Sequence, residues 1–267
     1  MEEYFQVSAF EPIVRREDWN SFESRLAIGM HLLLDLLQRY ETRATFFVLG
    51  WVAERHANLV RDVAAAGHEV ASHGWSHERV THQQPHEFRA SVRRTKRLLE
   101  DIIGAPVRGF RAPSFSIVPG REWALDVLLE EGYAYDSSLF PVVRPGYGYP
   151  SAQADPYWLE RPAGRLAEFP PSTLGRAPWR IPAGGGAYFR IFPYALARRA
   201  FTECERRGVS GTFYLHPWEL DIAQPLLRAG AVARLRHYTG LGRTGPRLER
   251  LLSEFQFTTI ADGLAHM

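Results

Sequence analysis

The sequence contains one cysteine, Cys204, in 267 residues. A single thiol excludes an intrachain disulfide and any metal site built from several cysteines. No apolar run approaches the roughly 18 residues that span a bilayer, and the start of the chain lacks the basic and apolar stretches of a secretory signal. We therefore expect a cytoplasmic protein without a transmembrane segment, in which Cys204 is a small buried residue on a helix.

A strong excess of charge of one sign is also absent. The 32 Lys and Arg residues stand against 30 Asp and Glu residues, which gives a net charge of +2 and a pI near 8.8. This balance is too mild to imply a nucleic-acid partner. Arginine pairs such as 93–94 and 206–207 fall on amphipathic helical patterns. We interpret them as solvated helix faces, with attraction of an anionic polymer as the alternative.

The order of apolar patterns predicts an α/β fold. Hydrophobic residues make up 45% of the chain, enough for one domain over 1–267, and α/β barrels often have this length. Alternating strands and helices imply a parallel sheet, and their number favours a distorted, incomplete (β/α) barrel. The passage 141–182, rich in Pro, Gly and Tyr, is the least regular. We expect helices at 22–40, 54–66, 85–103, 122–131, 194–207 and 246–254, and strands at 44–49, 68–72, 166–169, 212–215 and 257–260, with two more ending at Phe110 and Asp136.

His73 and His77 directly follow the predicted strand 68–72. Two imidazoles four residues apart can meet on one face of a helical turn, and both can then reach one divalent ion at roughly 2.0–2.1 Å. Two polar loop histidines without a ligand are the alternative, since the pattern lacks the central Glu of the zinc-peptidase signature. The positions of other reactive side chains favour the metal site.

Arg111, Asp136 and His216 each close a short β-branched or aromatic run. In a barrel of parallel strands, residues at the carboxyl ends of the strands converge on one face, where such enzymes keep their chemistry. A salt bridge for Arg111, a core position for His216 and a turn or helix cap for Asp136 are the structural alternatives. Because a guanidinium, a carboxylate and imidazoles all occur at strand ends, we favour a shared active site.

The same segments carry a family resemblance that covers nearly the whole chain. The chain resembles the NodB-homology polysaccharide deacetylases, the family-four carbohydrate esterases, in segments 44–50, 67–77, 110–113 and 214–217. It is most similar to the branch found beside exosortase and exopolysaccharide gene clusters, in segments 4–10, 181–190 and 215–219. A branch-specific C-terminal part is expected over about 141–267.

The resemblance implies a site and also shows a departure from the family. Members of this branch open with a strand that ends in a general-base Asp, and an acidic metal ligand follows shortly after. Here Glu2 falls on the ligand position and Met1 on the position of a Val, so that the base Asp and its strand are missing. A start codon assigned too late is the simplest explanation, and a pseudoenzyme is the alternative.

The roles that follow from the resemblance define a metal-dependent hydrolase. Glu2, His73 and His77 would hold a divalent metal, and an N/O donor set suits zinc while it tolerates cobalt or nickel. Arg111 would orient the missing base. His216 would protonate the leaving amine, with Asp136 as the carboxylate that favours its imidazolium.

The expected function is removal of N-acetyl groups from a polysaccharide or oligosaccharide in exopolysaccharide biosynthesis. Two alternatives are a cyclic imide or ureide hydrolase on the same scaffold and a noncatalytic glycan-binding protein. An open groove lined by Trp and Tyr would favour the sugar, and a small closed pocket would favour the imide. Trp75 and Trp218 could stack on a sugar ring or pack the barrel rim. Glu219 is interpreted as structural.

Overall fold

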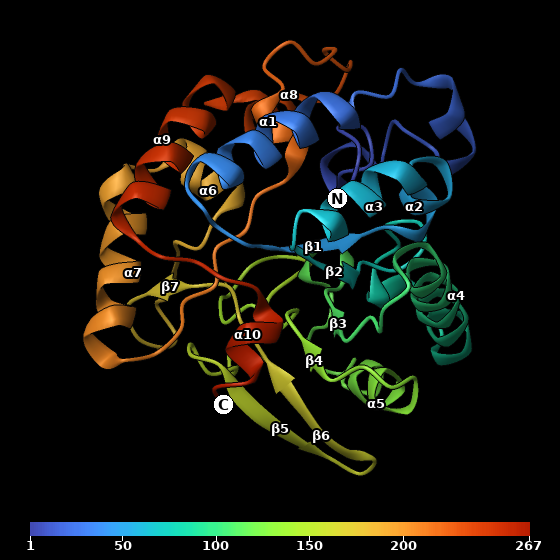
Figure 1. The fold of residues 1–267 in the computed structure, drawn as a ribbon, viewed down its shortest axis with the longest axis vertical. Helices are drawn as coiled ribbons and strands as arrows, with labels where there is room; N and C mark the ends of the chain where they lie inside the picture. The colour runs from blue at the N-terminus through green and yellow to red at the C-terminus, as the bar shows by residue number, and fades with distance from the viewer.

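The computed structural model describes residues 1–267 and is built around a six-stranded, mostly parallel sheet (Figure 1). The strand order is β1-β2-β3-β4-β6-β5, and only the β5–β6 hairpin at one edge is antiparallel. This arrangement confirms the predicted α/β class. The strands are β1 (Thr45–Val48), β2 (Glu69–Ser72), β3 (Gly109–Phe110), β4 (Tyr135–Asp136), β5 (Tyr157–Arg161) and β6 (Gly164–Glu168).

Helices that connect the parallel strands cover the sheet. They are α1 (Leu26–Arg39), α2 (Gly50–Arg55), α3 (Ala57–Ala65), α4 (Pro85–Ile103) and α5 (Trp123–Glu130). The α4 helix has the predicted bounds because its start and end are both encoded locally. Pro85 occupies its first turn, Gln84 and Glu87 form a capping box, and Gly104 ends it in the left-handed conformation.

The second half of the chain adds a two-stranded sheet and further helices on the side away from α4 (Figure 1). Its elements are β7 (Thr173–Leu174), β8 (Ile181–Pro182), α6 (Gly186–Ile191), α7 (Tyr194–Arg207), α8 (Ala231–Tyr238), α9 (Leu241–Glu254) and α10 (Ile260–Leu264). Short 3₁₀ helices are η1 (Ser8–Phe10), η2 (Arg16–Ser21), η3 (Val80–His82), η4 (Pro113–Phe115) and η5 (Pro217–Leu220). No helix is long and apolar enough to span a membrane.

The sheet does not close into a complete barrel. One edge of β1 pairs with β2, and on the other edge Met1 donates its ammonium to the Phe47 carbonyl. Residues 212–215, predicted as a strand, make only isolated bridges, from Thr212 to Pro171 and from Tyr214 to Gly185. A cavity of about 470 Å³ lies between β1 and residues 212–215, and its apolar walls include Leu33, Phe46, Phe213, Leu215 and Leu248.

Several sequence-based expectations were wrong in detail. The predicted strand 257–260 is a loop followed by α10, because the Thr259 hydroxyl accepts from the Asp262 amide and starts a helix. The predicted helix 54–66 is two helices, α2 and α3, that meet at His56. The irregular passage 141–182 contains the β5–β6 hairpin, and neither α6 nor α8 was predicted.

Candidate metal centre and active site

Glu2, His73 and His77 form a compact buried cluster beside the end of β1. The Glu2 Oε2 atom lies 3.6 Å from His73 Nε2 and 3.1 Å from His77 Nε2. One ligand atom from each of the three residues lies within 4.8 Å of the other two. Side chains of this kind at this separation can converge on a single divalent ion.

The loop after β2, rather than a helical turn, brings the two histidines together. Residues 73–79 are irregular, and Gly74 and His77 have positive φ values of 73° and 53°. A left-handed backbone conformation is uncommon for residues other than glycine, and at His77 it marks a constrained position. This backbone conformation turns the His77 ring towards His73, and the two ring centroids lie 5.4 Å apart. The expected helical geometry was therefore wrong.

The cluster fits a cation chemically. Glu2 Oε2 is buried without a hydrogen-bond partner, and such an atom is costly unless a ligand satisfies it. His73 donates from Nδ1 to the Arg111 carbonyl oxygen at 2.7 Å, which leaves Nε2 free as a ligand atom. Burial lowers the pKa of His73 to about 4, so that its imidazole is neutral, the form that binds metal.

The Glu2 carboxylate is held in its ionised form. Burial acts to raise the pKa of Glu2, but the neighbouring imidazoles of His77, His216 and His73 hold it well below its ordinary value. Trp218 also donates from Nε1 to Glu2 Oε1 at 3.3 Å. An ionised carboxylate and a neutral imidazole are the states that metal coordination requires.

Arg111 reaches the same cavity from the end of β3, but it pairs with no carboxylate. Its guanidinium donates to the Ser137 carbonyl at 3.1 Å and to the Ser137 hydroxyl at 2.7 Å. It lies 4.2 Å from the centre of the Phe47 ring. Burial lowers the pKa of Arg111 to about 10. A charged group in this setting favours an anion beside it.

His216 is oriented by Glu219 and not by Asp136, which corrects the expectation from the sequence. The His216 Nδ1 atom lies 2.7 Å from Glu219 Oε1, and the His216 backbone amide donates to the same oxygen at 3.0 Å. Pro217 begins η5, and the first turn of η5 brings Glu219 back beneath the ring. The i,i+3 spacing of His216 and Glu219 was the available signal for this pair. His216 Nε2 then points towards Glu2, 3.8 Å from Oε1.

Arg190, a residue that the sequence did not single out, completes this arrangement. It donates from Nε to Glu219 Oε2 at 2.6 Å, and both side chains are 1% exposed. Its remaining nitrogens donate to the carbonyl oxygens of Arg236, His237 and Thr239. Burial alone would raise the pKa of Glu219, but Arg190 and His216 hold it at about 2.

Replacement of Arg190 by methionine is expected to destabilise the fold by about 3–5 kcal/mol, because it leaves the Glu219 carboxylate buried without its partner. Urea unfolding measures the change. Arg199→Met is the matched control, since Arg199 pairs with Glu203 at the surface and its loss should cost less than about 1 kcal/mol. Equal unfolding midpoints for the two variants would contradict the assigned role of Arg190.

Asp136 does not line this cavity and faces a second buried acid, Glu168. Asp136 accepts from the Ser138 amide at 3.1 Å and from the Ser138 hydroxyl at 2.6 Å, and Glu168 accepts from the Leu139 amide at 3.0 Å. Both carboxyl groups are fully buried. Burial raises the pKa of Asp136 to about 6, and burial and the neighbouring Asp136 raise the pKa of Glu168 well above its ordinary value.

The Asp136–Glu168 pair predicts a pH-dependent stability. The folded state holds these protons more tightly than the unfolded chain, so the stabilisation is present at acidic pH and is lost as pH rises through about 6. Glu168→Gln keeps a neutral side chain and should reduce that loss between pH 4 and 7 by about 1–3 kcal/mol. Urea unfolding across this range, with the surface variant Glu249→Gln as control, measures it. An unchanged pH slope for Glu168→Gln would refute the prediction.

The two tryptophans that flank the motif histidines are packed by protein groups. The Trp218 ring stacks between His216, at 5.3 Å, and His237, at 4.1 Å. The Arg94 guanidinium lies over the Trp75 ring at 3.3 Å. These contacts favour the packing role for both side chains over sugar stacking.

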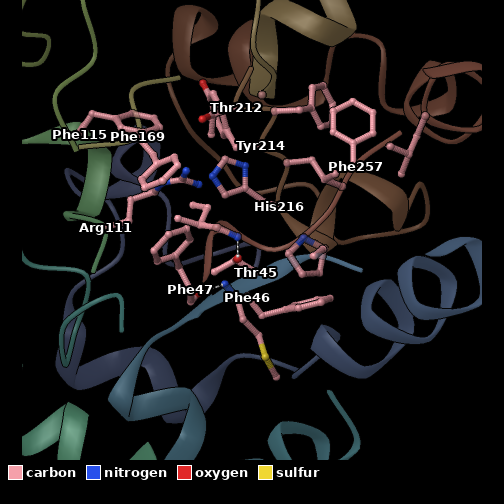
Figure 2. Close-up of a pocket in the computed structure, with 18 of the residues that line it drawn as sticks. Thr45, Phe46, Phe47, Arg111, Phe115, Phe169, Thr212, Tyr214, His216 and Phe257 are labelled. Carbon is pink, nitrogen blue, oxygen red and sulfur yellow. Dashed lines mark hydrogen bonds between the residues drawn. The ribbon is translucent and has the colours of Figure 1, made fainter. Parts of the chain in front are cut away.

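The site residues share one cavity with several tyrosines. Figure 2 shows Arg111, from the end of β3, and Tyr214 and His216, from a second segment, gathered around this cavity beside the β1 residues. Tyr147 and Tyr188 line it as well. Of the candidate site residues from the sequence, the cavity thus brings together Glu2, His73, His77, Arg111 and His216, and it excludes Asp136.

Comparisons with known proteins agree with the fold. Residues 29–121 match the family model described as polysaccharide deacetylase, and residues 137–265 match a domain of unknown function (DUF3473). A peptidoglycan-N-acetylglucosamine deacetylase of Bacillus cereus is 30% identical over 95 residues, which are 35% of this chain and 34% of that protein. A peptidoglycan deacetylase of Helicobacter pylori is 31% identical over 114 residues, 42% of this chain and 37% of that protein.

The chain thus spans about a third of the length of the curated relatives it matches. The solved structure of a probable polysaccharide deacetylase from Pseudomonas aeruginosa has a TM-score of 0.61 and 17% identity, and the match covers 88% of this chain and 70% of that one. At this identity the likeness shows the fold alone. Residues 29–121 are thus similar to polysaccharide deacetylases, and the fold of the chain agrees with this similarity.

Proposed function

We propose that the protein is a metal-dependent hydrolase that removes N-acetyl groups from a polysaccharide or oligosaccharide, in the production of an exopolysaccharide. The observation that carries the proposal is the buried triad of Glu2, His73 and His77, whose ligand atoms lie within 4.8 Å of one another. Arg111 and His216 line the same cavity. The similarity to curated deacetylases supports the reaction class.

The proposed chemistry divides among the residues of the cavity. A divalent ion, with zinc favoured by the N and O donors of Glu2, His73 and His77, would polarise the acetamide carbonyl and acidify a water. His216 acts as the general acid, because its Nε2 faces the triad while Glu219 fixes Nδ1. The products are acetate and a free amine on the sugar.

Arg111 marks the place of the general base. Its guanidinium pairs with no Asp or Glu side chain of the chain and bonds only to Ser137. A carboxylate held there by a bidentate pair could remove the proton of the attacking water. The same observation favours the second candidate function, a noncatalytic glycan-binding protein.

Zinc-loaded protein is expected to release little acetate from N-acetylchitohexaose on its own and clearly more when formate is added. Formate supplies a small carboxylate that can pair with Arg111. Acetate release and the mass of the products measure the reaction, and the double variant His73→Ala/His77→Ala is the control that should stay inactive. Binding of the oligosaccharide with no acetate release, with or without formate, would overturn the hydrolase in favour of the binding protein.

The cavity weighs against the cyclic imide or ureide alternative. Its volume of about 470 Å³ and its lining tyrosines suit a sugar chain better than a small planar ring. Hydrolysis of allantoin, a cyclic ureide, by the same zinc-loaded protein decides between the two activities. We expect no hydrolysis of allantoin.

A further inference from the structure

Two arginines and two tyrosines form a cluster at the edge of the cavity that holds the metal triad, where Arg236 and both tyrosines line the cavity and Arg144 contacts Tyr188. Tyr147 and Tyr188 line the cavity, and their hydroxyls lie 2.5 Å apart. Arg144 donates from Nε to the Tyr188 hydroxyl at 3.1 Å. The Arg236 guanidinium lies 5.9 Å from the centre of the Tyr147 ring and also lines the cavity. We call these four residues the arginine rim.

The arginine rim carries positive charge without protein counter-ions. Arg144 and Arg236 are both exposed, and neither has a carboxylate within 4.0 Å. The surrounding segment 222–248 contains five arginines and no Asp or Glu. Among the cavity-lining residues the only acids are Glu2 and Glu205, and Glu2 belongs to the triad. The potential at this side of the cavity is therefore positive.

We propose that the arginine rim binds the carboxylates of an acidic glycan, so that the substrate is an N-acetylated polysaccharide that also carries uronic acid residues. The inference rests on the proposed function and names its substrate class. A guanidinium pairs with a carboxylate through two parallel hydrogen bonds, and a tyrosine ring offers an apolar face to a sugar. A neutral glycan would leave both exposed guanidiniums without a partner.

The positive charge of the arginine rim also affects how tightly the product binds. Removal of an acetyl group creates an amine that is protonated at neutral pH, and the arginine rim would repel it. We therefore expect poorer binding of a fully deacetylated chain than of the acetylated one, which would favour release of the product.

Isothermal titration calorimetry of the full chain tests the proposal. A hyaluronan hexasaccharide and N-acetylchitohexaose both contain N-acetylglucosamine, but only the first has a carboxylate on alternate sugars. We expect the hyaluronan probe to bind about 10-fold more tightly at about 50 mM salt, and to lose this advantage at about 500 mM salt. Arg144→Glu/Arg236→Glu should abolish the preference for the hyaluronan probe.

The control is Arg97→Glu/Arg206→Glu, which makes the same change in net charge at two exposed arginines that do not line the cavity. This control should keep the preference. If the wild type binds both probes equally, or the neutral one more tightly, the acidic-glycan inference fails while the deacetylase proposal stands. If the control variant loses its preference for the hyaluronan probe to the same extent, the preference is an effect of net charge. That result would also overturn the assignment of carboxylate binding to the arginine rim. If neither probe binds, the inference falls together with the proposed function.

Discussion

Replacement of His73 or His77 by alanine is expected to abolish the retention of divalent metal. The three ligand side chains are nearly fully buried, and the ligand atoms of the two histidines approach the same Glu2 oxygen. Two protein ligands rarely hold zinc against dialysis, because the site depends on three or four donors. Elemental analysis of purified, zinc-loaded protein after dialysis measures the result, with about one zinc per chain expected for the wild type.

The matched control for this experiment is His82→Ala, which removes an exposed imidazole from η3. Its zinc content should equal that of the wild type. Glu2→Gln should weaken retention as well, since an amide is a poorer ligand than a carboxylate. Wild-type protein that holds no divalent metal, or a His77→Ala variant with full occupancy, would contradict the metal centre.

Replacement of His216 by alanine is expected to lower acetate release from N-acetylchitohexaose by roughly 10²- to 10⁴-fold, the range for loss of one general acid. Metal content should stay unchanged, because His216 Nε2 lies outside the three-ligand cluster, 3.8 Å from the nearer Glu2 oxygen. Turnover is compared at saturating zinc and in the presence of formate.

An aryl acetate ester provides the internal control for His216→Ala. Its leaving group needs no proton, so ester hydrolysis should fall much less than amide hydrolysis. Equal losses on ester and amide, or loss of zinc together with the imidazole, would show that His216 is a ligand or a packing residue and not the acid.

The sequence predicted the elements whose signals are local. The α4 and α7 helices have the predicted bounds because the apolar spacing, a proline at or just before the start and a glycine just after the end are all local signals. The strands β1 and β2 are each buried at their last three positions, as expected for strands covered on both faces. The predicted strand 212–215 failed because pairing depends on a neighbouring strand, which no local pattern encodes.

The structure brings five of the six candidate site residues to one cavity, but the sequence did not reveal which side chains they contact. The residues of the Glu2, His73 and His77 cluster came from motif spacing and from the resemblance. The Glu219–Arg190 pair joins residues 29 positions apart, from α6 and η5, and depends on how these elements pack. Asp136 was given the wrong role for the same reason, since its position at a strand end does not reveal that Glu168 faces it.

The most direct test of the metal centre is anomalous X-ray diffraction from crystals grown with zinc, recorded on both sides of the zinc absorption edge. We expect one strong peak between Glu2 Oε2, His73 Nε2 and His77 Nε2, on the side of the cavity that faces His216. The absence of a peak among these three atoms, or a peak only at surface histidines, would contradict the metal centre.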